Sequence, residues 1–360
     1  MKNRLILAAA GSGKTQYIIN EAIKITDAKV LITTYTISNT DEIKKRLIRT
    51  CGGSIPGNIV VQTWFSFLLQ HGIKPFSPSL FETHIDGIFF PERGFKVFYK
   101  KTQPKGYYLN NSRNVNAEKA SELIEDINKA SKGAVIDRIS EIFKYIFIDE
   151  VQDLASYDYE LVKLLLYSES SITLVGDPRQ VTYQTNHGNK NSKYKNKIDL
   201  FIRYECPDSE TIVDTTSLQT SFRSHQDICA LANKLYPKYP PAESAGLPKT
   251  GHDGLFVVKD KDLVNYLKKY HPIQLRWNKT RKVSSLTPVF NFAESKGLTF
   301  ERTLIYPTVP FQLWLKEGTL PTEGSLPNLY VSITRARYSV AVVWDDHSET
   351  PDGFELYEPC

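Results

Sequence analysis

Cysteine and methionine are scarce in this sequence, and long apolar runs are missing. The 360 residues include only one Met and four Cys, and Cys51, Cys206, Cys229 and Cys360 lie far apart without metal-type spacing. Such spacing implies neither a zinc site nor a disulfide framework. No apolar stretch approaches the length of about 20 residues that a membrane span needs. These absences favour a soluble protein of the reducing cytoplasm.

A large excess of charge of either sign is also missing. The chain has 45 Lys and Arg against 40 Asp and Glu, a formal net charge of +5. This balance mildly favours a polyanionic partner such as nucleic acid but does not establish one. With 41% hydrophobic residues and 360 positions, the chain is long enough for two cores of ordinary size.

The segment "RLILAAAGSGKTQ" is typical of a phosphate-binding loop between a strand and a helix. An apolar run turns at two glycines, and "QYIINEAIKI" then has helical spacing. In such a loop, backbone N–H groups at a helix N-terminus surround phosphates, a Lys reaches the β and γ oxygens, and a Thr hydroxyl holds Mg²⁺. The loop residues are Ala8, Ala9, Ala10, Gly11, Ser12, Gly13, Lys14 and Thr15, with Ala8 in place of the usual first Gly.

Two carboxylates follow a second apolar run, "YIFIDEVQDL". The run predicts a buried parallel strand over Tyr145–Ile148, and α/β sheets place their ligands at the carboxyl ends of such strands. We therefore expect Asp149 to hold Mg²⁺ and Glu150 to act as general base on the attacking water. A third strand, "SITLVGDPRQ", ends close to Gln180, a residue type that can contact a γ-phosphate.

Six motifs follow one another along the chain: "AAAGSGKT", "IDEVQD", "VGDPRQ", "TSFRS", "ESKGLTF" and "YVSITRAR". Their order resembles that of the motifs of superfamily 1 helicases. The chain thus resembles the UvrD/Rep-like branch, as a compact member without the large second-domain insertion. The resemblance implies an α/β fold of two RecA-like P-loop domains, parallel sheets flanked by helices, with ATP in the cleft between them. We expect residues 1–215 to form the first domain, with a reduced insertion at about 75–140, and residues 216–360 to form the second.

The resemblance also assigns roles to residues of the second half. Arg223 and Arg335 match the arginines that reach the γ-phosphate, where a guanidinium neutralises developing charge. A surface salt bridge is the alternative for each arginine. Lys296 and Gly297 match the motif that lies between ATP and the DNA strand, although Thr299 replaces its usual acidic residue.

Several residues are candidates for contact with nucleic acid. Thr36 lies in a segment that resembles the family's contact with the phosphate backbone, and Thr63 and Trp64 follow nearby. Trp64 could stack on a base, but an aromatic residue in an apolar run is more often part of the core. A basic segment carries Lys190 and Lys193, for which phosphate contact and a solvated loop are equally acceptable.

The chain also departs from its family. Thr185 and Asn186 occupy the positions of a Trp and an Arg that hold the strand in relatives, and no Gln precedes the phosphate loop to read adenine. Within the insertion, "ERGFKVFYKKTQPKGYYLNNSRN" interleaves lysines with tyrosines, a composition that suits single-stranded nucleic acid or a solvated loop.

Two functions remain open from the sequence. The first is an ATP- and Mg²⁺-dependent helicase or translocase on single-stranded or tailed double-stranded DNA, moving 3′ to 5′ by resemblance. The second is a regulatory ATPase that binds nucleic acid and licenses a nuclease partner without unwinding, for example in anti-phage defence. The missing stacking residues and the missing insertion make the second function credible.

Overall fold

The chain divides into two compact units. The structure is a computed structural model that describes residues 2–92, 94–182 and 188–359. The first unit comprises residues up to Leu7, Lys14–Pro178 and the part of 184–214 that is described. The second unit comprises Ala8–Gly13, Thr215 onward and the described residues that follow Pro178 up to 182. The phosphate loop is therefore grouped with the second unit, although its flanking strand and helix belong to the first.

The first unit is built on a six-stranded parallel sheet with the order β3-β2-β6-β7-β1-β8. Its central strands are continuous apolar runs because both faces of a parallel sheet are covered. Since β7 lies between β1 and β6, the phosphate loop and the two carboxylates leave the same sheet edge one strand apart. The strands are β1 (Arg4–Leu7), β2 (Val30–Thr34), β3 (Ile59–Thr63), β6 (Tyr145–Asp149), β7 (Ser171–Gly176) and β8 (Ile212–Asp214).

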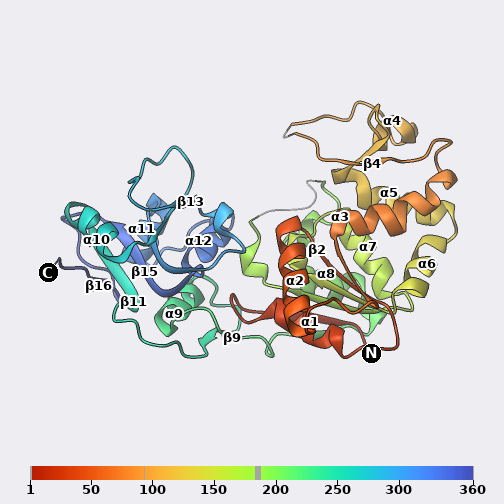
Figure 1. The fold of residues 1–360 in the computed structure, drawn as a ribbon. Helices are drawn as coiled ribbons and strands as arrows, with labels where there is room; N and C mark the ends of the chain where they lie inside the picture. Colours follow the sequence, from red (N-terminus) through yellow and green to blue (C-terminus); the bar gives the residue numbers. More distant parts are fainter. Residues whose placement is uncertain (1, 93, 183–187, 360) are drawn as a thin grey trace. The chain divides into compact units, whose positions relative to one another are not determined.

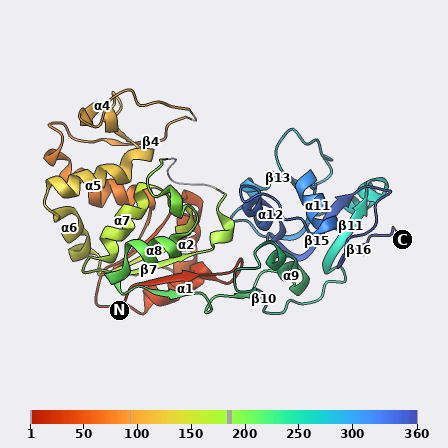
Figure 2. The same ribbon diagram turned by 180° about the vertical axis from the view of Figure 1, so that it is seen from behind.

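Helices cover both faces of this sheet. Figures 1 and 2, seen from opposite sides, place α1 and α2 on one face and α7 and α8 on the other. Each helix turns an apolar stripe inward; in α2, for example, Ile43 and Leu47 are buried. The helices are α1 (Lys14–Ile23), α2 (Ile37–Thr50), α3 (Trp64–Phe67), α5 (Ala120–Ala130), α6 (Ala134–Ile142), α7 (Tyr157–Leu166) and α8 (Ile198–Glu205).

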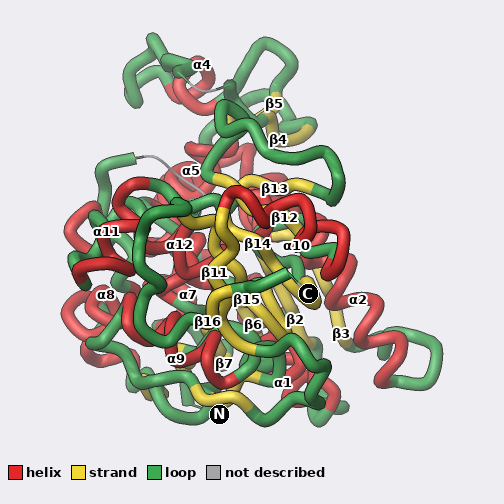
Figure 3. Tube along the Cα trace, turned by 90° about the vertical axis from the view of Figure 1, so that its left-hand side faces the viewer, coloured by secondary structure: helices red, strands yellow, loops and turns green. Residues whose placement is uncertain are grey.

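An insertion between α3 and α5 carries little regular structure. It contains the short parallel strands β4 (Gly87–Phe89) and β5 (Asn114–Asn116) and the single-turn helix α4 (Pro104–Tyr108). Figure 3 shows β4 and β5 side by side near α4, with most of the segment in loops. Tyr108 and Val115 anchor the segment in the core of the first unit.

The second unit contains another six-stranded parallel sheet, with the order β13-β12-β14-β15-β11-β16. The two sheets confirm the expected α/β class with two RecA-like halves. The strands are β11 (Gly254–Lys259), β12 (Ile273–Arg276), β13 (Val289–Asn291), β14 (Phe300–Ile305), β15 (Ala336–Trp344) and β16 (Glu355–Leu356). A separate two-stranded ladder joins β9 (Thr220–Ser221) and β10 (Glu243–Ser244).

Four helices pack around the second sheet. They are α9 (Gln226–Leu235), α10 (Leu263–Tyr270), α11 (Val309–Glu317) and α12 (Leu326–Ile333). The core beneath α9, α11 and α12 includes Leu231, Trp314 and Tyr330. Among the described helices of the chain, none combines the length and apolarity that crossing a membrane requires.

Candidate nucleotide site and nucleic-acid interface

The phosphate loop has the geometry of an anion site. Strand β1 ends at Leu7 and α1 begins at Lys14, as the sequence predicts. Gly11 and Gly13 have φ angles of +73° and +81°, a region that side chains with a Cβ rarely adopt. The Ser12 hydroxyl is buried without a hydrogen-bond partner in the described part of the chain, and the first turn of α1 carries no acidic side chain. A phosphate would satisfy both the hydroxyl and the helix N-terminus.

Thr15 and Asp149, which lie in distant motifs, meet in the first unit. The Thr15 Oγ1 hydroxyl donates to Asp149 Oδ2 at 2.9 Å. Burial raises the pKa of Asp149, as does the neighbouring Glu150 carboxylate, while Lys14 and the Thr15 hydrogen bond act in the opposite direction. A divalent cation would offset this cost of burying the carboxylate.

These oxygens fit Mg²⁺. The ion takes one or two protein carboxylates and completes its shell with water and substrate phosphates. The described residues contain no group of three or more His, Cys, Asp or Glu side chains that could hold a metal by themselves. Thr15 and Asp149 would therefore supply part of a shell that the nucleotide completes.

Glu150 has a strained backbone and a fixed side chain. Its φ of 56° lies in the left-handed region, which costs a non-glycine residue about 1–2 kcal/mol. Gln152 Nε2 donates to Glu150 Oε2, and Gln152 Oε1 accepts from the backbone N–H of Asp177 at 3.0 Å. A Cβ on Gly176 would lie 2.3 Å from Gln152 Oε1, so the glycine makes room for this orienting amide. Gln152 was not predicted as a site residue, although it stands within the motif "DEVQD".

In the second unit, Arg335 is tied to Gln180. Arg335 is buried, and its Nη2 donates to Gln180 Oε1 at 3.1 Å. Its Nε and Nη1 donate to the carbonyl oxygens of Val331 and Leu298, each at 3.2 Å. The guanidinium thus has a fixed position, and it connects two motifs that the sequence assigned separately to the γ-phosphate.

Gly297 shapes the turn that supplies one of these acceptors. Its φ of +83° lies in the region that favours glycine, and the next residue, Leu298, offers its carbonyl to Arg335. Thr299 and Glu301 are exposed, and Glu301 lies 3.6 Å from Arg302. The assignment of Gly297 to nucleotide binding stays a prediction, but its turn contributes to the position of Arg335.

Arg223 and Phe222 lie against the phosphate loop within the second unit. The Phe222 N–H donates to the Gly11 carbonyl at 2.9 Å. A Cβ on Gly11 would lie 2.6 Å from Arg223 Cβ and 2.7 Å from Ser221 Oγ. Phe222 is 64% exposed, and its ring lies 4.0 Å from the position that a Cβ on Gly13 would take. This exposed ring beside the loop was not predicted, although it precedes Arg223 in "TSFRS".

Three further contacts hold the alanines of the loop. Arg179 Nη2 donates to the Ala8 carbonyl at 3.2 Å, and the Ala9 N–H donates to the Leu218 carbonyl at 2.7 Å. The Ala10 N–H donates to the Tyr330 hydroxyl at 3.4 Å. Arg179 also lies over the Tyr330 ring, 5.1 Å from its centroid, which fixes the guanidinium beside the loop.

The threonines predicted to contact nucleic acid lie at neighbouring strand ends. Thr63 is the last residue of β3 and pairs in register with Thr34 at the end of β2. Thr36 caps α2 by accepting from Asn39 N–H at 3.1 Å, and Thr63 caps α3 by accepting from Ser66 N–H at 3.2 Å. The N-terminus of α2 at a sheet edge suits a phosphate group.

Trp64 does not face solvent, so its assignment as a base-stacking residue is wrong for this structure. It is 1% exposed, and its Nε1–H donates to Asp158 Oδ1 at 3.0 Å. Its ring packs at 5.6 Å from that of Phe67. No face of the indole is available to a base, and the core alternative holds.

The predicted lysines make ion pairs with residues of neighbouring helices. Lys190 Nζ lies 3.5 Å from Glu160, and Lys193 Nζ lies 3.1 Å from Glu205. All four side chains are at least partly exposed, and such pairs are weak enough for phosphates to compete with them. Their role in nucleic-acid binding stays a prediction. Thr185 and Asn186, the positions of the missing stacking residues, lie outside the described residues.

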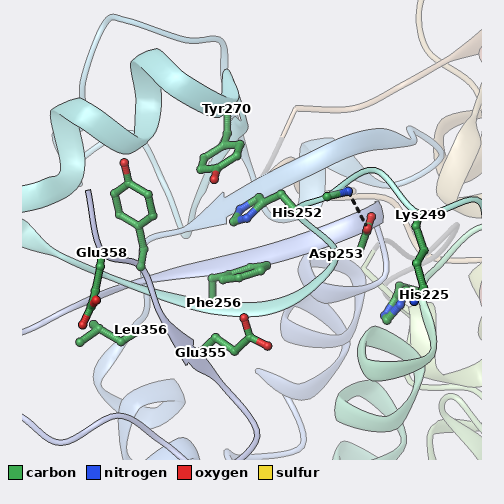
Figure 4. A pocket seen from close by; sticks show the side chains of 11 residues that line it. His225, Lys249, His252, Asp253, Phe256, Tyr270, Glu355, Leu356 and Glu358 are labelled. Carbon is green, nitrogen blue, oxygen red and sulfur yellow. Dashed lines mark hydrogen bonds between the residues drawn. The ribbon is translucent and has the colours of Figure 1, made fainter. Parts of the chain in front are cut away.

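A cavity of about 490 Å³ in the second unit was not predicted (Figure 4). On one side the His252 ring lies between Tyr270 and Phe256, with centroids at 3.7 and 3.8 Å. Its Nε2 is 2.9 Å from the Tyr266 hydroxyl. Burial and the nearby Arg302 lower the pKa of His252 to about 4. The imidazole is therefore neutral at neutral pH and acts as a packed ring.

Comparison with known proteins agrees with this geometry. Residues 1–74 and 99–198 match the UvrD/REP helicase N-terminal domain. The chain thus carries a UvrD/REP helicase N-terminal domain and is distantly homologous to Rep and DNA helicase II proteins. The matched residues hold the phosphate loop, the carboxylates and Gln180 of the site.

The relatives in the UvrD/Rep helicase family are distant. The ATP-dependent DNA helicase Rep of Buchnera aphidicola subsp. Schizaphis graminum is 25% identical over 284 residues, which cover 64% of this chain and 41% of that protein. The ATP-dependent DNA helicase srs2 of Schizosaccharomyces pombe is 32% identical over 109 residues, 30% of this chain and 11% of that protein. The chain thus spans about two fifths of the Rep relative's length, and a smaller part of srs2 is matched.

A solved structure similar to the chain is that of arterivirus nonstructural protein 10, a helicase. The similarity covers 95% of this chain and 59% of that chain at 14% identity, with a TM-score of 0.45.

The descriptions of the reported relatives name DNA helicases and do not support the anti-phage role considered from the sequence.

Proposed function

We propose that the chain is an ATP-dependent helicase or translocase that acts on single-stranded or tailed double-stranded DNA and moves 3′ to 5′. Lys14, Thr15 and Asp149 hold MgATP, and Glu150 activates water. The direction of movement rests on the family resemblance. Family membership supports an ATPase coupled to DNA, and the geometry of this chain's own residues supports the individual roles.

The hydrogen bond between Thr15 and Asp149 carries the proposal. It joins the first helical turn after the phosphate loop to the end of a strand 134 positions away. The paired oxygens would serve as ligands for a cation bound to the β- and γ-phosphates. When bound, Mg²⁺ would neutralise charge on the phosphate oxygens.

Glu150 is proposed to accept the proton of the attacking water. Its carboxylate is held by Gln152, so only one of its oxygens needs to face the water. The strained backbone at Glu150 is consistent with a functional position, because surrounding structure must hold such a conformation in place. The water oxygen would attack the γ-phosphorus as its proton moves to the carboxylate, and ADP would leave.

Arg335 and Gln180 are proposed to couple hydrolysis to movement. Arg335 would neutralise charge on the γ-phosphoryl group, and an arginine in this role is worth about 10³ to 10⁵ in rate. Arg223 would act with it. Because Gln180 bonds to Arg335, a change at the γ-phosphate reaches a side chain buried in the second unit.

Phe222 is proposed to stack on the adenine ring. It is an exposed aromatic residue within reach of Gly13, and a flat ring can cover one face of a base. Stacking is tolerant of base identity because every base has a π-face. We therefore expect weak selectivity among ATP, GTP and CTP, and a higher KM for all three in Phe222→Ala.

The test is steady-state ATP hydrolysis with and without single-stranded DNA. Wild type should be strongly stimulated, and Arg335→Lys, which keeps a charge but loses the guanidinium fork, should lose the stimulation. Arg337→Ala serves as the matched control, because this neighbour lies over the Tyr338 ring and is assigned a structural role. Equal stimulation of wild type and Arg335→Lys would contradict the role of Arg335.

The regulatory ATPase that licenses a nuclease remains the alternative outcome of this experiment. Hydrolysis that is absent or indifferent to DNA would favour it over the helicase. A strand-displacement assay on tailed duplex, run in both polarities, then separates unwinding from translocation alone.

A further inference from the structure

The insertion of the first unit exposes an unusual concentration of aromatic rings. Within residues 89–106, here called the insertion loop, Phe98 is 89% exposed, and Phe90, Phe95 and Tyr99 are more than half exposed. Isolated exposed apolar residues are ordinary, but a group of large rings marks an interaction surface. In Figures 1 and 2 the segment with β4 and α4 extends beyond α5, away from the sheet of its own unit.

The rings of the insertion loop are held in different ways. Phe95 packs edge-on against Phe89 at 5.8 Å. A Cβ on Gly106 would lie 2.4 Å from the Tyr99 ring, so Tyr99 covers the glycine of α4. In contrast, Phe98 has no ring partner among the described residues. Burying Phe98 would therefore need a molecule other than the described part of this chain.

The charge of the insertion loop selects the kind of partner. Residues 89–106 contain five basic side chains and one acidic side chain. Lys101 already forms ion pairs, since its Nζ lies 2.9 Å from Asp126 and 3.2 Å from Glu122. Lys96, Lys100 and Lys105 are exposed and have no ion pair within the described ranges. Lysines without an ion pair, next to exposed rings, suit a single-stranded nucleic acid, whose phosphates they can contact while its unpaired bases stack on the rings.

A row of rings connects the insertion loop to the strand ends. Tyr35, which precedes the Thr36 cap, lies 5.7 Å from Phe65, and Phe65 lies 5.0 Å from Phe90 in an edge-to-face arrangement. Phe90 directly follows β4 and is 65% exposed. Through the buried Phe65 ring, the insertion loop therefore packs next to the edge that carries Thr36 and Thr63.

We infer that the insertion loop is a second contact for single-stranded DNA, in which Phe98 stacks on a base and Lys96 and Lys100 contact phosphates. This inference rests on the proposed function, because it extends the path of the strand that the strand-end threonines begin. It adds a binding surface outside the six helicase motifs. It also predicts that affinity depends on strand length, since a short strand reaches only one of the two contacts.

The test measures binding of fluorescent oligothymidines of about 8 and about 20 nucleotides by anisotropy, a range that brackets typical single-strand site sizes. Phe98→Ala should weaken binding of the longer strand by about 5- to 100-fold, the value of one stacked base, and leave the shorter strand nearly unaffected. Because Phe98 is almost fully exposed, the variant should fold normally. Tyr167→Ala is the matched control, as it removes an exposed ring at the opposite, amino-terminal edge of the same sheet.

A salt titration tests the lysines. The double variant Lys96→Ala, Lys100→Ala should lower the slope of log K against log salt by about 1.4, at about 0.7 per phosphate contact on a single strand. Lys29→Ala, an exposed lysine just before β2, should leave the slope unchanged. A matching RNA oligonucleotide shows whether the loop distinguishes the two backbones.

The outcomes separate the two proposals. If wild type does not bind single-stranded DNA, both the helicase function and the insertion-loop contact are refuted. If wild type binds and its hydrolysis is stimulated, but Phe98→Ala and the lysine variant bind the longer strand as wild type does, only the insertion-loop contact fails. The exposed rings would then serve a protein partner.

Discussion

Gly11→Ala probes the close approach between the phosphate loop and the segment Ser221–Arg223. The substitution adds one methyl group at a φ of +73°. That methyl carbon would lie 2.6 Å from Arg223 Cβ and 2.7 Å from Ser221 Oγ. The Ser221 hydroxyl can rotate away, but Arg223 Cβ is fixed to its backbone, so the backbone of the loop or of its neighbour must shift.

The loss of folding stability expected for Gly11→Ala has two parts. An alanine in the left-handed region costs about 1–2 kcal/mol, and forcing a methyl group into filled space costs about 1–3 kcal/mol. Gly52 has the same φ of +73° with nothing within 4 Å of the position of its Cβ. Gly52→Ala should therefore show only the first part, about 1–2 kcal/mol, and Gly11→Ala the sum, about 2–5 kcal/mol.

The assays are urea unfolding and steady-state ATP hydrolysis. A loop shift of about 1 Å at the phosphates should reduce kcat/KM by about 100-fold in Gly11→Ala, while Gly52→Ala should hydrolyse ATP as wild type does. If Gly11→Ala instead matches Gly52→Ala in both assays, the loop does not lie against Arg223 in solution. The proposed use of Arg223 at the nucleotide would then lose its structural support.

Three further predictions concern single side chains. Glu150→Gln should bind ATP as wild type does but lose turnover in a single-turnover assay, and unchanged hydrolysis would remove Glu150 as the base. Trp64→Phe should cost about 2–4 kcal/mol in urea unfolding, through the lost donor to Asp158 and the small cavity, with unchanged oligonucleotide affinity; weaker DNA binding would restore its stacking role. Because the folded pKa of His252, about 4, lies below its unfolded value near 6.5, the unfolded chain binds the extra proton between these pH values. Stability conferred by this group is thus lost as pH falls through that window, by about 2 kcal/mol from pH 7 to pH 5. His252→Phe should be less sensitive over this range, and an equal loss in both proteins would refute the assignment.

The sequence predicted the features that local patterns encode. The apolar runs before Ala8 and Asp149 form parallel strands, and the strand, loop and helix follow in the expected order. The motif spacing led to the correct family because each motif contains its own chemistry. The sequence pattern assigns Thr15 and Asp149, 134 residues apart, to one metal site. The structure joins their side chains by a hydrogen bond, and the metal site itself stays a prediction.

The features that the sequence did not predict are side-chain contacts that depend on tertiary packing. Trp64 has the same neighbours in sequence whether it is buried or exposed, and it is buried here because it packs in the core of the first unit, where Asp158 on α7 accepts its indole N–H. Lys101 and Lys100 are adjacent and chemically identical, yet only Lys101 meets the carboxylates of α5. The His252 ring stacks on Phe256 and Tyr270, and no motif or periodicity in the sequence predicts these ring contacts.

The hydrogen bond between Arg335 and Gln180 has a consequence for the proposed nucleotide site, because a nucleotide that binds Arg335 would have to replace Gln180 as its hydrogen-bond partner. Without a ligand, the Arg335 Nη2 donor already has an acceptor at 3.1 Å. A phosphate oxygen that takes this donor would displace Gln180 Oε1, and a buried acceptor left without a donor costs about 1–3 kcal/mol. If ATP binds as proposed, part of its binding free energy would offset the release of Gln180, so Gln180 would compete with the nucleotide for the same arginine.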